Sequence, residues 1–473
     1  MKIIVLLIVA IQLANFSLAQ HHELSDKAIM WKGKQFLAKD TNSILYALKT
    51  GDTHGHFRYF FSNTVNQGLL SDYYGNAIGG GIRYESNKYK KLQFAVSGFY
   101  FFDLGSSNLA QLDSLSNQPN RYEIGLFDIE NPNNHNDMDR LEELYFKYNF
   151  KNTHLILGRQ LINTPMINLQ DGRMRGTGVE GLWFESNPFK NISLSGGWLT
   201  GISPRSTTKW YSVPESIGVY QQGVTTTGTK SNYKDNLTSL GVGVVGVKFS
   251  LSEQLKGQFW NYYVENIINS FFTQFNYLKP LNKTTKLLVA GQLVHQVALN
   301  NGGNDVSSMS YTNKGAQALT FGAKIGVTRK KLDVSLNYNR ITKKGRYLFP
   351  REWGRDPFFT FMPRERNEGF GDLHALMVKF EYKELVKNLN TTFAIGYFSL
   401  PDVTNYALNK YGMPSYFQAN LDIRYNFDKL IEGLEGQLLI VAKLNNGNTY
   451  NTPKYEHNKV NMLLTNVVLN YHF

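Results

Sequence analysis

The chain has 473 residues, of which 42% are hydrophobic, 14% aromatic and 18% charged, and its formal net charge is +13. The aromatic content excludes an intrinsically disordered chain, and the absence of cysteine excludes a disulfide framework, thiolate catalysis and thiolate-ligated metals. The basic residues are spread along the chain without a continuous stripe, so we expect no nucleic acid partner.

The first 19 residues have the pattern of an export signal. Lys2 precedes an apolar stretch over residues 3–10, and Ser17, Leu18 and Ala19 form a small-x-small cleavage site. We therefore expect a signal peptide over residues 1–19 and a periplasmic segment over residues 20–54. No later apolar run is long enough for a spanning helix, so a membrane-embedded mature chain would have to be a closed β-barrel.

From residue 55 onward, apolar and polar residues alternate with a period of two. Between Phe417 and Phe427 every odd position is apolar, while the even positions carry Gln, Asn, Asp, Arg and Asn. The same alternation recurs over residues 332–339 and 463–473. This period predicts β-strands with one apolar and one polar face.

The alternation recurs in about 18 segments, each long enough to cross a bilayer as a tilted strand. Short polar turns, such as residues 85–88 and 187–190, follow every second strand, and long loops separate the others. This asymmetry predicts an all-β fold for residues 55–473, a transmembrane antiparallel β-barrel with short periplasmic turns and long extracellular loops. A β-sandwich or propeller is the alternative, but the chain has no blade-length repeat.

The apolar faces would then meet lipid, and the polar faces would line a water-filled lumen. Aromatic residues at the strand ends, including Tyr425, Phe427, Tyr471 and Phe473, are typical of an interfacial girdle. Alternation assigns more basic than acidic side chains to the lumen, which favours anions. The basic set is Arg58, Arg83, Lys147, Lys248, Lys286, Lys324, Lys379, Arg424 and Lys443, and the acidic set is Glu85, Glu143, Asp333, Glu381 and Asp422.

Residues 159–178 form the most unusual connection, because they are polar yet keep several large apolar residues. We expect residues 161–176 to fold into the lumen and form a constriction that binds solutes through Asn163, Asp171, Arg173 and Arg175. Arg159 would join them if a bulge at Gly158 turned it inward. The alternative is an outward loop stabilised by a turn from Asp171 to Arg173. We expect Lys286 and Lys443 to lie away from the narrowing.

The connection over residues 342–371 concentrates arginines among aromatic residues. Because the guanidinium fork pairs with carboxylates in a fixed geometry, this loop predicts solutes that carry a carboxylate. Attraction to anionic lipopolysaccharide is an equally open explanation. The arginines are Arg346, Arg351, Arg355, Arg364 and Arg366.

Several motifs resemble the OprD-type outer-membrane porins in their Bacteroidetes-like branch. They lie at Leu157 to Gln160, Asn163 to Pro165, Asn168 to Arg173, Gly181 to Ser186, Gly55 to Phe61, Ala77 to Gly81, Asn120 to Phe127 and Asp139 to Tyr145. The C-terminal Phe473 is similar to the assembly signal of such barrels. The resemblance implies an 18-stranded porin, monomeric or trimeric, with its third extracellular loop in the lumen opposite a ladder of basic residues. It also implies small carboxylate nutrients, such as amino acids and organic acids, as preferred solutes.

No motif points to a cofactor or to a resident metal. Residues 241–246 match GxGxxG but lie within an alternating strand that no helix follows, so they offer no phosphate site. Residues 133–139 hold enough oxygen ligands for Ca²⁺ but lack EF-hand spacing. The leading hypothesis is therefore passive diffusion of small hydrophilic solutes across the outer membrane of a Gram-negative bacterium, without enzyme activity. An adhesin or an enzyme at the barrel rim is the alternative.

Overall fold

The computed structural model describes residues 30–32, 36–170 and 173–473. The expected signal peptide and Asp171 therefore lie outside the described residues. No helix in the described ranges has the length and apolarity needed to span a membrane.

The described chain is built almost entirely of β-strands that belong to one sheet of 21 strands. Three strands are only two residues long, and the other 18 form the wall. The short strands are β1 (Asp40–Thr41), β4 (Lys88–Tyr89) and β10 (Tyr211–Ser212). The long strands are β2 (Asp52–Asn66), β3 (Tyr73–Glu85), β5 (Leu92–Asp103), β6 (Met138–Phe150), β7 (Thr153–Gln160), β8 (Gly178–Phe189), β9 (Ile192–Ser203), β11 (Val242–Ser250), β12 (Leu255–Val264), β13 (Ile268–Pro280), β14 (Thr285–Ala298), β15 (Gln317–Arg329), β16 (Leu332–Ile341), β17 (Leu373–Tyr382), β18 (Leu389–Ser399), β19 (Tyr416–Asn426), β20 (Leu434–Asn445) and β21 (Met462–His472).

The sheet closes into a barrel because its first and last long strands pair. β2 is antiparallel to β3 on one side and to β21 on the other, with Phe60 opposite Val468. Closure continues to the chain end, where Gly55 and Phe473 exchange two backbone hydrogen bonds of 2.7 and 3.1 Å. A Cβ at Gly55 would lie 2.0 Å from the Phe473 ring, so glycine is required for this approach. The prediction of an 18-stranded antiparallel barrel is confirmed.

The exterior of the wall is apolar, as the alternation predicts, whereas the inner face combines polar residues with apolar ones such as Val242, Trp260 and Phe272, which pack into a core with the inward loops. In β19, Gln418 and Asn420 are buried, whereas the preceding Phe417 is exposed. Gln418 donates to the Pro363 carbonyl of a loop inside the barrel, at 2.8 Å, which places the polar face toward the lumen. Arg424 and Asp422 share that face. Phe417 and its odd-numbered neighbours therefore face the membrane.

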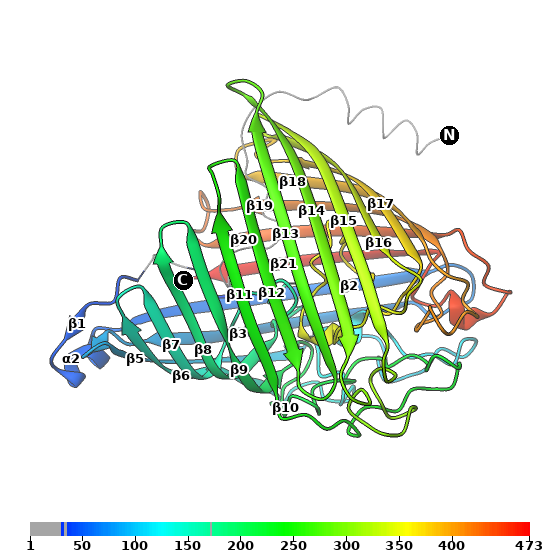
Figure 1. Cartoon of the computed structure of the whole chain (residues 1–473), viewed down its shortest axis with the longest axis horizontal. Helices are drawn as coiled ribbons and strands as arrows, with labels where there is room; N and C mark the ends of the chain where they lie inside the picture. The colour runs from blue at the N-terminus through cyan, green and yellow to red at the C-terminus, as the bar shows by residue number, and fades with distance from the viewer. Residues whose placement is uncertain (1–29, 33–35, 171–172) are drawn as a thin grey trace.

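The two ends of the barrel differ in their connections, as Figure 1 shows. One end has short turns and the short helix α2 (Ile44–Lys49). The other end carries the long loops 104–137, 161–177, 204–241, 299–316, 342–372, 400–415 and 446–461, together with two short connections at 67–72 and 265–267. Three single-turn helices lie in these loops: η1 (Glu123–Leu126), η2 (Arg351–Trp353) and η3 (Pro453–Tyr455).

Two boundaries differ from the sequence expectation. Residues 187–189 belong to β8, because a register irregularity between Ser186 and Phe189 carries the strand through the expected turn. Alternation predicts a strand over residues 236–250, but β11 begins at Val242, and Leu237 is buried among loop residues instead of pairing in the sheet.

Candidate functional site

Loop 342–372 lies within the lumen and is held there by side chains of the wall. Gln292 of β14 donates to the Pro357 carbonyl at 2.7 Å, and its own carbonyl accepts from the Phe359 backbone N–H at 3.2 Å. Gln296 makes the same kind of reciprocal pair with the backbone of Leu348. The wall amides thus satisfy loop backbone groups that would otherwise be buried without partners.

Segment 161–177 packs against this loop. The Tyr262 hydroxyl of β12 accepts from the Met166 backbone N–H at 3.2 Å and donates to the Thr164 hydroxyl at 3.0 Å. Asn168 then joins the two loops, because its backbone N–H donates to the Trp353 carbonyl at 3.1 Å and its side chain to the Arg355 carbonyl at 3.1 Å. Met166 and Ile167 are buried in the resulting contact.

Loop 104–137 contributes a third element, the single-turn helix η1. Its Glu123 is fully buried and accepts hydrogen bonds from Ser62, Thr64 and Asn120 at 2.6–2.9 Å. Burial raises the pKa of Glu123 despite these hydrogen bonds. The carboxyl therefore anchors η1 to the lumen face of β2.

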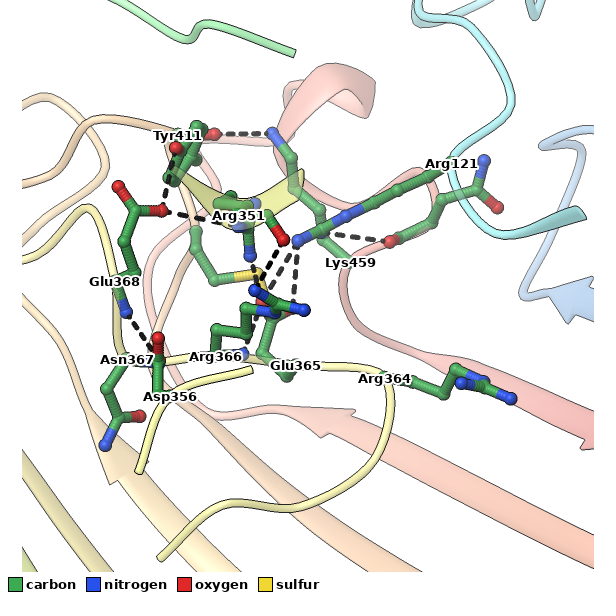
Figure 2. Close-up of polar contacts among 12 residues, drawn as sticks. Arg121, Arg351, Asp356, Arg364, Glu365, Arg366, Asn367, Glu368, Tyr411 and Lys459 are labelled. Carbon is green, nitrogen blue, oxygen red and sulfur yellow. Dashed lines mark hydrogen bonds and ion pairs between the residues drawn. The ribbon is translucent and has the colours of Figure 1, made fainter. Parts of the chain in front are cut away.

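Glu365 is the centre of an ion-pair cluster that links these elements. Arg121 of loop 104–137 donates to both of its carboxylate oxygens, at 3.0 and 3.1 Å, and Arg351 donates to one at 3.1 Å. Lys443 of β20 completes the cluster at 3.0 Å. Figure 2 shows the arginines converging on Glu365 from separate segments. Although burial opposes ionisation, Arg121, Lys443 and Arg351 hold the pKa of Glu365 well below its usual range.

Glu368 and Asp356 form a second acidic group in the same loop. Glu368 accepts from the Tyr411 hydroxyl at 2.9 Å and lies 3.3 Å from the Arg351 Nε (Figure 2). Asp356 accepts from the backbone N–H groups of Asn367 and Glu368 at 3.0 and 3.2 Å. Burial raises the pKa of both carboxyls, opposed by the cations near each. These contacts fix the conformation of the part of loop 342–372 that carries the arginines.

The three loop elements, together with loop 204–241, enclose an opening rich in arginine. Its empty volume is about 650 Å³, including open solvent. Among the described residues that line it, six are arginines and one, Glu365, carries a carboxylate. The lining residues are Arg121, Arg173, Arg205, Arg351, Arg364 and Arg366 with Glu365, and beside them Asn120, Tyr122, Gly125, Ile129, Tyr220 and Gln221.

Only some of the residues expected at the constriction line this opening. Arg173 does. Asn163 lies half-buried at the start of its loop. Arg175 is buried, with 3% of its surface exposed, and its Nε donates to Glu142 at 2.6 Å while its guanidinium lies 4.1 Å from the Phe99 ring. These contacts make Arg175 a residue that holds the loop to the wall.

The expectation that Arg159 turns inward is corrected. The register of β6 and β7 is unbroken, with Leu144 opposite Arg159, so Gly158 adopts a positive φ without inserting a bulge. Arg159 therefore shares the outward face with Leu144. There it pairs with Glu180 at 2.9 Å and stacks 4.8 Å from the Trp210 ring.

The nine basic residues expected on the lumen wall do lie on its inward face, and four of them contact a carboxylate of the same wall. Arg83 pairs with Glu143 at 3.0 Å, and Arg424 with Asp422 at 2.9 Å. Lys379 pairs with Glu381 at 3.4 Å, and Lys147 with Glu85 at 3.9 Å. Two others contact aromatic rings: Lys324 lies 5.7 Å from the Phe359 ring, and Arg58 lies 5.4 Å from the Phe60 ring. Much of the wall charge is thus locally balanced.

Sequence reasoning missed Arg121 and Arg205 as members of the opening. It also expected Lys443 to act as a wall residue apart from the inward loops, whereas its ammonium group contacts Glu365 of loop 342–372. A signal for Arg121 was present, because Asn120, Arg121 and Tyr122 lie in one of the motifs that carry the family resemblance. No group of three or more metal-ligating side chains occurs among the described residues. Near the suggested Ca²⁺ loop, Glu130 instead pairs with Lys234 and Tyr211.

Comparisons with known proteins place this geometry in a family. The barrel is similar to Pseudomonas aeruginosa OccK9 (OpdG), with a TM-score of 0.70, 14% identity and coverage of 90% of this chain and 99% of that one. It is also similar to Acinetobacter baumannii OccAB4, with a TM-score of 0.66, 17% identity and coverage of 89% and 97%. Pseudomonas aeruginosa OpdK with vanillate gives a TM-score of 0.66, 13% identity and coverage of 90% and 99%.

A search of the curated proteins found no match. The family model for outer membrane porins of the OprD family matches residues 110–359, which is more than half of the chain and includes most of the segments that enclose the opening. The chain belongs to the OprD family of outer membrane porins.

Proposed function

We propose that this outer-membrane porin favours anions, and carboxylate-bearing solutes in particular, at the arginine-lined opening. The observation that carries the proposal is the composition of that opening, six arginines against Glu365. Arg121, Arg351 and Lys443 already surround this one carboxylate, so its charge is compensated within the cluster. The field at the narrowing then favours small anions.

The proposal assigns solute contact to the opening and a supporting role to the wall. Salt screens charges beyond ~8 Å at physiological ionic strength, so only groups near the narrowing discriminate strongly between ions. Arginine suits this role because its planar fork donates two hydrogen bonds to one carboxylate. OpdK, a protein of similar fold, was solved with vanillate, which carries a carboxylate.

Transport through such an opening is diffusion, with no bond made or broken. We propose no catalytic residue and no cofactor. Expected substrates are small organic acids or amino acids, whose carboxylate would pair with the guanidinium groups while aromatic lining such as Tyr122 and Tyr220 contacts the carbon skeleton.

Planar-bilayer recording tests the proposal. The purified porin should give discrete conductance steps and a reversal potential, across a salt gradient, that shows anion preference. Arg173→Ala should lower the anion-to-cation permeability ratio. Arg329→Ala is the matched control, because it removes an exposed arginine at the end of β15, outside the lumen-facing register of Lys324. Equal ratios in the native protein and Arg173→Ala would show that the opening is not the filter.

A further inference from the structure

The short helix α2 exposes an unusual amount of apolar surface for a segment outside the barrel wall. Four of its six residues are large and apolar, and each exposes about half of its surface. The exposed fractions are 60% for Ile44, 58% for Leu45, 53% for Tyr46 and 46% for Leu48. Leu37, a few residues earlier, is 78% exposed. An apolar surface so concentrated marks a contact with a partner or a membrane.

The helix is nevertheless held in a defined position. Ser43 caps it by accepting from the Tyr46 backbone N–H at 3.2 Å. The backbone N–H of Asn87 donates to the Ala47 carbonyl at 3.0 Å, and the Asn87 side chain donates to the Thr50 carbonyl at 2.6 Å. Ala47 is the residue that packs inward. The helix is therefore docked on the connection between β3 and β5, at the barrel end with the short turns (Figure 1).

One contact shows on which side of the wall α2 lies. The Tyr84 hydroxyl of β3 donates to the Leu48 carbonyl. Tyr84 shares its strand face with Ile82, which is 60% exposed, whereas Arg83 between them points into the lumen toward Glu143. The C-terminal end of helix α2 thus lies beside the outward face of the barrel at Tyr84, next to the surface that meets lipid.

Lysines surround this apolar surface. Lys49 ends the helix, and Lys88, Lys90 and Lys91 lie in the connection on which the helix docks. The ammonium groups of Lys90 and Lys91 lie 5.5 and 5.6 Å from the rings of Tyr89 and Phe150. A cluster of apolar side chains bordered by aromatic rings and lysines is typical of protein segments at the membrane interface, where ammonium groups contact lipid phosphates.

We propose that α2 inserts its apolar face into the periplasmic leaflet of the membrane that the barrel spans, and so anchors the N-terminal arm to the bilayer. Continuity with the lipid-facing surface at Tyr84 and Ile82 identifies lipid as the occupant, and the lysines complement its phosphate groups. The side chains of Ile44, Leu45 and Leu48 lie at the boundary between headgroups and acyl chains. This role is independent of which solutes the lumen conducts.

Spin-label accessibility in proteoliposomes tests the proposal, and the natural absence of cysteine permits single-site labelling. Leu45→Cys should be labelled and its collisions with oxygen and with a water-soluble nickel chelate compared. Leu293→Cys on the outward face of β14 is the lipid reference, and Lys314→Cys in loop 299–316 is the water reference. We expect the label at position 45 to collide more with oxygen than with the nickel chelate, as the label at position 293 should. Nickel access equal to that at 314 would overturn the proposal.

Dilution distinguishes lipid from a second copy of the chain. If lipid covers α2, protection of the label at 45 should persist when the protein is diluted in excess lipid with unlabelled porin. Protection that disappears on dilution would assign the surface to another copy and overturn the proposal. A second variant, Leu45→Asp with Leu48→Asp, should expose Lys39 and Lys49 to trypsin while single-channel conductance stays unchanged. Unchanged protease resistance in this variant would also contradict membrane insertion.

Discussion

The wall of the barrel and the loops inside it use basic residues in different ways. On the wall, Arg83 and Arg424 each contact a carboxylate two residues away on the same strand, and Arg83 also contacts Glu143 two strands away across β5. In the loops, Arg121 and Arg351 come from segments far apart in sequence and share Glu365. Alternation along a strand therefore sets where a wall charge lies, whereas contacts between loops decide which charges line the opening.

The largest effect should follow from removing the shared carboxylate. Glu365→Gln leaves Arg121, Arg351 and Lys443 without their common counter-charge in a buried site, and breaking a buried ion pair from one side costs about 3–5 kcal/mol. We expect loss of loop order, measured as noisier open-channel current and a lower urea midpoint in lipid vesicles. Glu381→Gln on the wall, whose partner Lys379 is half-buried, should cost ~1 kcal/mol or less.

A result in which the two substitutions destabilise the porin equally would remove the distinction between wall and loop charges. It would mean that the cluster around Glu365 is no more desolvated than the wall pairs.

The second effect separates two arginines that the sequence treats alike. Arg175→Ala should lower stability by about 3 kcal/mol, because it removes a cation from the buried Glu142. Arg173→Ala should lower anion preference more than Arg175→Ala does, since Arg173 lines the opening. Unfolding curves and reversal potentials of both variants give the comparison. A larger selectivity change in Arg175→Ala, at unchanged stability, would reverse these roles.

The third effect concerns the wall itself. Arg424→Ala removes a cation that already pairs with Asp422 and is well exposed to the lumen, so its loss changes the local field little. We expect a shift in the permeability ratio smaller than that of Arg173→Ala. A shift of equal size would show that the wall arginines act as a ladder for solutes, as the family resemblance implies.

Sequence reasoning predicted the barrel because alternation is a local property that each strand displays by itself. β19 illustrates this, since Phe417 and Asp422 face opposite sides as their positions require. The loop contacts could not be predicted in the same way. The bonds from Asn168 to Trp353 and from Arg121 to Glu365 join residues separated by well over a hundred positions, and no local period encodes them. Arg159 was misplaced because Gly158 suggested a bulge where the register is continuous.

The smallest effect is the response to mild acid, and its sign follows from the two kinds of carboxyl in loop 342–372. Although burial opposes it, the surrounding cations hold the pKa of Glu365 below that of an unfolded glutamate, so its contribution to stability is complete above pH ~4.5 and is lost only as pH falls through the lower folded pKa. Burial raises the pKa of Glu368 and Asp356 above that of the unfolded chain, so their protonation as the pH falls favours the folded loop.

Lowering the pH from 7 to 5 should therefore leave the loops in place, with unchanged open-channel noise and a urea midpoint that is equal or slightly higher. Glu365→Gln provides the control, because its loops should already be loose at pH 7 and their noise should not depend on Glu365 titration. If the open-channel current of the native porin instead becomes noisier between pH 7 and 5, the cations around Glu365 do not keep its carboxyl group deprotonated. The cluster would then be a pH-sensitive contact, and the contrast between the desolvated loop charges and the solvated wall charges would be smaller than their contacts indicate.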